Sequence, residues 1–106
     1  MKLSLILAFI FIAMVLQGQG IYTVYFGNLH SHTGFSDGEQ TPADAYTYAR
    51  DVAGIDFLAV TDHMEQVSGD ELLQTQQAAA AATQPGGFVG IAGYEWGSPY
   101  YGHCNV

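Results

Sequence analysis

The stretch IDFLAVTDH, at residues 55–63, decides the fold class. Its first six residues are mostly apolar, which is typical of a short strand buried in a parallel sheet. Thr61, Asp62 and His63 follow at once, so residues that can do chemistry stand where this strand ends. The stretch therefore predicts a buried strand that brings polar side chains to one edge of a sheet.

A helix is predicted before this strand. Its start combines an N-cap residue, a proline at the first helical position and an acid three residues after the cap, at Thr41, Pro42 and Asp44. Apolar residues recur on one face of this helix, at Ala45, Ala49 and Val52. Gly54 is well placed to end it.

A second helix is predicted after the strand, from about Ser68 to Gln84, because Ser68 and Glu71 form a capping-box pattern. Its apolar face is thin, so we expect this helix on the outside of the fold. Two further strands are predicted at residues 21–26 (IYTVYF) and 88–94 (FVGIAGY). The alternation of strands and helices predicts an α/β fold, a βαβαβ unit with a parallel sheet.

Metal-capable residues gather where the three predicted strands end. His30 and His32, with Asp37 soon after, follow the first strand, and Asp62 and His63 follow the second; Glu95 ends the third, with His103 a short loop later. All four histidines of the chain lie at these ends. Because the carboxyl ends of parallel strands share one edge, we expect these side chains to converge there.

The residue types indicate divalent metal binding. Histidine and carboxylate together are ligands for Zn, Mn or Fe. His30 and His32 should point the same way, since side chains in extended backbone alternate with a period of two. A carboxylate such as Glu95 can bridge two ions, and two ions about 3.5–4 Å apart can activate water for phosphoryl hydrolysis.

These motifs resemble the PHP family, the polymerase and histidinol phosphatase domain. The resemblance rests on HSH (30–32), FSDG (35–38), TDH (61–63), GYEW (93–96) and GH (102–103), and it runs from about Phe26 to the last residue. The contexts around His30 and Glu95 look like an exported PHP-like subgroup. The order and spacing of the motifs make the resemblance more specific than an HxH pair alone.

The resemblance implies a distorted (β/α)7 barrel with a trinuclear metal site, of which this chain would be the βαβαβ N-terminal portion. It implies ligand roles for His30 and His32 at a first ion, for Glu95 as the bridge to a second, for His103 at the second, and for Asp37 and His63 at a third. Glu95 and Asp62 are the residues it marks as catalytic, with Asp62 orienting or hydrogen-bonding rather than binding an ion directly.

The implied activity is hydrolysis of a small phosphorylated substrate by a metal-bound hydroxide, with two or three ions in a complete domain. The family completes its site with a later His and an Asp-x-His motif, which this chain lacks. We therefore expect an incomplete N-terminal fragment that is inactive alone. Two alternatives stay open: an inactive truncated metal-binding fragment, and a metal-dependent amidohydrolase. The amidohydrolase would need a lysine on a middle strand, whereas Lys2 is the only lysine.

Composition narrows the partners. The formal net charge is −8, and Lys2 and Arg50 are the only Lys or Arg residues, so a nucleic acid is not an expected partner. A phosphate ester would need positive charge from bound ions instead. One cysteine, Cys104, excludes an internal disulfide and a cysteine-rich zinc site. Trp96, Tyr100 and Tyr101 either line a substrate pocket or only pack.

Residues 1–20 read as a signal peptide. Lys2 precedes an apolar run at residues 3–16, and QGQG follows at residues 17–20. The run is shorter than the roughly 20 apolar residues of a membrane span. We expect cleavage after Gly20, export to the periplasm or medium, and no stable membrane association of the hydrolase domain at residues 21–106. The alternative is an uncleaved anchor.

Overall fold

Three parallel strands form the centre of the molecule. The computed structural model describes residues 22–106. Strands β1 (Gly27–Asn28), β2 (Phe57–Val60) and β3 (Val89–Ala92) pair in that order, with Gly27 opposite Phe57 and Phe57 opposite Val89. The predicted α/β class, with its parallel sheet, is confirmed. The predicted signal peptide at residues 1–20 lies outside the described residues.

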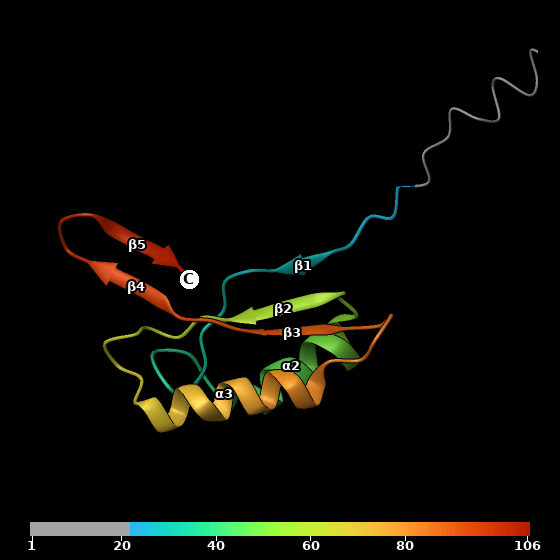
Figure 1. Ribbon diagram of the computed structural model, residues 1–106, viewed down its shortest axis with the longest axis horizontal. Coiled ribbons are helices and arrows are strands. Elements are labelled where there is room, and N and C mark those ends of the chain that lie inside the picture. The colour runs from blue at the N-terminus through green and yellow to red at the C-terminus, as the bar shows by residue number, and fades with distance from the viewer. Residues whose placement is uncertain (1–21) are drawn as a thin grey trace, which may run out of the picture.

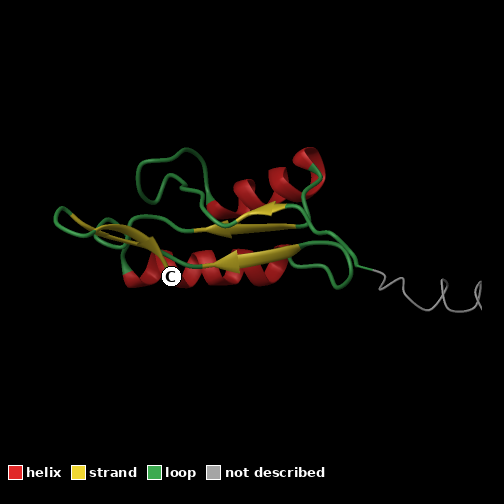
Figure 2. Cartoon of the chain, turned by 90° about the horizontal axis from the view of Figure 1, so that it is seen from above, coloured by secondary structure: helices red, strands yellow, loops and turns green. Residues whose placement is uncertain are grey.

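The helices cover one face of this sheet. Helix α2 (Pro42–Tyr48) continues into a π-helical segment, η1 (Ala49–Ala53), and helix α3 (Gly69–Ala82) lies beside α2. Figure 1 places both helices below the strands, and Figure 2 shows the strands in front of the helices when the molecule is viewed from above. The other face of the sheet is therefore uncovered by helices in the described part of the chain.

Both predicted helix starts are confirmed. Thr41 and Asp44 form a capping box, as do Ser68 and Glu71: each N-cap hydroxyl accepts from the backbone N–H three residues on, and each acid accepts from the N-cap N–H. These bonds satisfy backbone donors that a helix start otherwise leaves unpaired. Gly54 ends the π-helical segment with a φ of 65°, a backbone conformation that glycine adopts without strain.

The core is small and lies between the sheet and the helices. Its buried members are Tyr46, Ala49, Leu58, Val60, Ala79, Ala82 and Phe88. The Tyr46 hydroxyl donates to the Ile91 carbonyl at 2.7 Å, which ties α2 to β3. Helix α3 packs closely on β3 because Gly90 has no side chain: a Cβ there would lie 2.7 Å from the Ala79 carbonyl oxygen.

Two predictions about this part of the fold are wrong. Val52 is 68% exposed, because it lies in the π-helical segment, whose wider turn breaks the spacing of the predicted apolar face; Tyr46, in α2, is fully buried. Residues 22–26 lie outside any strand, and β1 begins only at Gly27. Its partner β2 starts at Phe57, so the residues before Phe26 have no strand beside them to pair with.

A hairpin that the sequence reasoning missed follows the sheet. Strands β4 (Glu95–Ser98) and β5 (Gly102–Asn105) pair antiparallel, with Gly97 opposite His103. In Figure 1 this hairpin extends from the end of the sheet to which β1, β2 and β3 point. Within residues 22–106, no helix is long and apolar enough to cross a membrane.

Candidate metal centre

His30 and His32 lie just beyond β1, in chain that still runs beside β2. The Thr61 N–H donates to the Ser31 carbonyl at 2.7 Å, and the Ser31 hydroxyl donates to the Ala59 carbonyl at 2.6 Å. Ser31 thus faces the neighbouring strand, and the two imidazoles on either side of it face away together. Their Nε2 atoms lie 3.0 Å apart, so the predicted common direction of this pair is confirmed.

Glu95 stands at the centre of the histidines. Pairing between β2 and β3 extends past both strands, since the Glu95 N–H donates to the Asp62 carbonyl and Glu95 bridges to His63. This continuation sets the Glu95 carboxylate, which is only 4% exposed, among nitrogens from separate segments. The nearest nitrogens are His103 Nδ1 at 2.8 Å, His32 Nε2 at 2.9 Å, and His30 Nε2 and His63 Nδ1 at 3.4 Å each.

The environment of Glu95 favours its charged form. Burial by itself raises the pKa of this carboxyl, but the hydrogen bond from His103 and the charges of His103, His30 and His63 outweigh it. The net effect is a Glu95 pKa below its ordinary value. An ionised, buried carboxylate with imidazoles around it is a suitable bridge between cations.

His103 reaches the cluster from a strand, after the short loop at residues 99–101 that separates this strand from β4. It lies on β5, and its ring rests against Gly97 of β4, where an added Cβ would come within 3.1 Å of Nε2. Glu95, Gly97, His103 and Asn105 share one face of the hairpin, because side chains alternate along each strand. Trp96 lies on the opposite face, so it does not line the side of the hairpin that faces the histidines.

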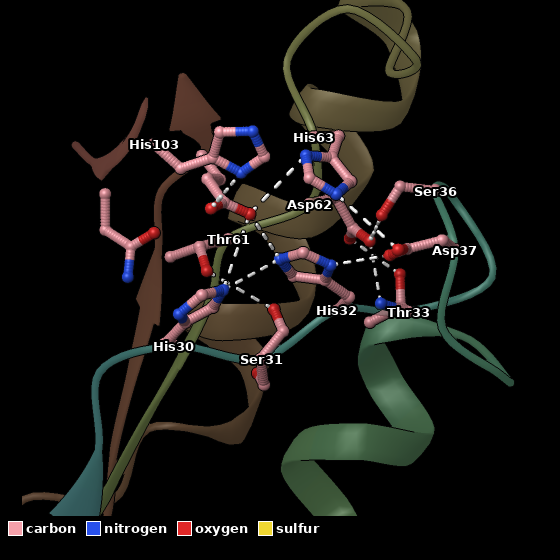
Figure 3. Close-up of polar contacts among 12 residues, drawn as sticks. His30, Ser31, His32, Thr33, Ser36, Asp37, Thr61, Asp62, His63 and His103 are labelled. Carbon is pink, nitrogen blue, oxygen red and sulfur yellow. Dashed lines mark hydrogen bonds and ion pairs between the residues drawn. The ribbon is translucent and has the colours of Figure 1, made fainter. Parts of the chain in front are cut away.

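Asp37 and His63 complete the cluster on its other side (Figure 3). Asp37 Oδ1 lies 2.6 Å from His32 Nδ1, and Asp37 Oδ2 lies 3.5 Å from His63 Nε2. The hydrogen bond with His32, assisted by the charges of His32 and His63, holds the pKa of Asp37 below its ordinary value, although burial acts in the opposite direction. His63 Nδ1 is buried and makes no hydrogen bond within the described chain, which leaves it free to bind an ion.

The six predicted ligands thus meet in three overlapping groups, and within each group the ligand atoms lie within 4.8 Å of one another: His30, His32 and Glu95; His32, Asp37 and His63; and His63, Glu95 and His103. Ligand atoms on one tetrahedral zinc ion, at 2.0–2.1 Å from it, are about 3.3–3.4 Å apart. The separations in the first group are 2.9, 3.0 and 3.4 Å, so one pair has this spacing and two pairs lie about 0.3–0.5 Å closer in the metal-free chain.

Asp62 lies beside the cluster and contacts a loop. Its Oδ1 accepts from the Thr33 N–H at 2.7 Å and from the Ser36 hydroxyl at 2.5 Å, and its Oδ2 accepts from the Thr33 hydroxyl at 2.7 Å. Asp62 is 4% exposed and Thr33 is fully buried. The sequence reasoning did not identify Thr33 and Ser36 as site residues. Their place between His32 and Asp37, in a stretch that contains Gly34 and is followed by Gly38, was the available signal.

Positively charged Lys and Arg side chains are scarce in the described part of the chain. Arg50 is the only Lys or Arg among residues 22–106, and its guanidinium bonds to Asp51 and to the Ala82 carbonyl at the end of α3.

Comparison of the chain with models of known protein families, with curated proteins and with solved structures found no match.

Proposed function

We propose that this chain supplies the ligands of a metal-dependent phosphoesterase centre of the PHP type, acting on a small phosphorylated substrate. One observation carries the proposal: the buried Glu95 carboxylate has imidazole nitrogens from four histidines within 3.4 Å. Uncompensated burial of a carboxylate is costly, and ligation of cations by the same residues is the usual reason to assemble such a set.

The donor set suits Zn, Mn or Fe. His30 and His32 would hold one ion with one oxygen of Glu95, and His63 and His103 would hold another with the same carboxylate. Divalent ions bound there would bind the phosphate oxygens and lower the pKa of water. Arg50 is engaged elsewhere, so the ions would also provide the positive charge that a phosphate needs in this acidic chain.

The sheet supports a barrel as the full architecture. We infer that β1, α2, β2, α3 and β3 begin a distorted (β/α)7 barrel, whose helices would all lie outside the strands. Leu29, Val89 and Ile91 are exposed apolar side chains at or near the sheet, as expected of strands whose inner face other strands would cover. Export of the chain stays a prediction.

The test is the metal content and activity of the 106-residue chain and of a longer form of it. Metal-free protein would be dialysed against Zn²⁺ or Mn²⁺, the ions per chain counted by mass spectrometry, and hydrolysis of an aryl phosphate followed in the same samples. We expect at least one ion per chain here, and measurable hydrolysis in a longer chain that also supplies the later His and Asp-x-His ligands of the family pattern. His30→Ala should lower the number of bound ions and abolish the hydrolysis. Met64→Ala, a substitution of an exposed side chain next to His63, should retain both.

Two results would count against the proposal. A wild-type chain that takes up no transition metal would contradict the metal centre. A longer chain that also supplies the later His and Asp-x-His ligands, binds ions and still leaves the ester intact at every metal concentration would fit a metal-binding module without phosphoesterase activity.

A further inference from the structure

Asp37 contacts the first ligand group, which is His30, His32 and Glu95, through a hydrogen bond with the imidazole ring of His32. His32 Nδ1 lies 2.6 Å from Asp37 Oδ1, while Nε2 of the same ring lies 2.9 Å from Glu95 Oε2 and 3.0 Å from His30 Nε2. A neutral imidazole carries one N–H. If Nδ1 donates to Asp37, then Nε2 presents its lone pair to the point where His30, His32 and Glu95 converge.

The loop that carries Asp37 is itself anchored. The Asp37 side chain is 58% exposed, so its position depends on the backbone beneath it. Three hydrogen bonds from Thr33 and Ser36 to the buried Asp62 fasten the chain just before Asp37. Gly38 packs against the His32 backbone with no room for a Cβ, which keeps the loop folded back on the histidine. The Asp62 contacts therefore fix where the Asp37 carboxylate meets His32.

We propose that Asp37 is a positioning residue for the His30–His32–Glu95 group, that it acts through the tautomer and orientation of His32, and that Asp62 fixes the loop that makes this possible. The family resemblance gives Asp37 only the role of ligand to a different ion. The two roles are compatible, because Oδ1 contacts His32 while Oδ2 faces His63 Nε2. The inference rests on the proposed metal centre for its ion-binding test, but its tautomer test does not need an ion.

The ion-binding test isolates the first group. His63→Ala removes a member of both other groups and leaves His30, His32 and Glu95 as the remaining set. In that background Asp37→Ala should weaken Zn²⁺ binding by about 10–100-fold, the usual effect of losing a carboxylate that orients a ligating histidine. Asp37→Asn should lose less, because its amide oxygen still accepts from Nδ1. An affinity within about twofold of the His63→Ala parent would overturn the proposal.

Glu65→Gln provides the matched control in the same background. The Glu65 side chain is also 58% exposed and lies near the cluster, 3.7 Å from His63 Nδ1 in the parent chain, but it does not contact His32. Both substitutions remove one exposed negative charge near the site, so they share the general electrostatic effect. We expect Glu65→Gln to change Zn²⁺ affinity by less than about twofold. An equal loss in both variants would mean that charge, not positioning, explains the Asp37 effect.

The second readout uses the metal-free chain of 106 residues. Nitrogen NMR of the imidazoles should show His32 protonated at Nδ1 in the wild type, with this preference lost in Asp37→Ala and reduced in Ser36→Ala, which removes one bond to Asp62. If the wild-type chain binds no Zn²⁺ but shows this tautomer pattern, the proposed function fails and the positioning role stands. A His32 whose Nδ1 carries no proton in the wild type would contradict the positioning role directly.

Discussion

The helix-covered face of the sheet and the histidine-lined edge at its carboxyl end differ in the polarity of their side chains. The covered face is apolar and close-packed, around Tyr46, Val60 and Phe88. The edge is polar, and its central Glu95 is buried among imidazoles that repel one another when protonated. The difference indicates that the apolar face stabilises the fold, and that part of this stability offsets the cost of holding the polar side chains of the edge together. Substitutions should therefore separate into two kinds.

The largest expected effect on stability is in the covered face. Phe88 is 1% exposed, so Phe88→Ala should lower the free energy of unfolding by about 3–5 kcal/mol. A domain of this size has only a few kcal/mol to lose, so loss of the helical circular dichroism signal at room temperature is the expected result. Val89→Ala, at the adjacent exposed residue on the other face, should cost under about 1 kcal/mol in urea unfolding. Equal losses would contradict a core confined to the helix side.

A medium effect is expected where α3 meets β3. Gly90→Ala would place a Cβ 2.7 Å from a backbone oxygen of Ala79, which cannot move without shifting the helix. The cost should be about 1–3 kcal/mol, the range seen for overpacking. Gly69→Ala is the control, since an added Cβ there meets nothing within 4 Å, and it should be neutral or slightly stabilising. Urea denaturation of both variants measures the difference.

The smallest effect on stability is expected at the edge. The His30 side chain is 52% exposed, so His30→Ala should change the unfolding free energy of the metal-free chain by no more than about 0.5 kcal/mol. The same variant is the one expected to lose the ion of the His30–His32–Glu95 group. A loss of more than about 2 kcal/mol without metal would mean that the histidine edge contributes to folding after all, and the contrast between the two regions would fail.

The sequence predicted what local chemistry determines. Both capping boxes were readable because their partners are three residues apart, and the meeting of the histidines with Glu95 followed from the rule that parallel strands end at one edge. The π-helical segment could not be predicted from the sequence, because its buried face depends on how α2 packs on the sheet. The β4–β5 hairpin was missed, although Pro99 and Gly102 mark its turn, with Gly102 at a φ of 82°. The contact between Asp62 and Thr33 joins residues 29 positions apart, and no local pattern encodes it.

The crowding of histidines around Glu95 has a consequence for how the protein can diverge. A histidine at the rim could be replaced by another donor while the rest of the set stays in place. Position 95 has less freedom, because aspartate is one methylene shorter and would withdraw its oxygens from partners on two sides at once. In a library covering every substitution, position 95 should be the least tolerant of the ligand positions.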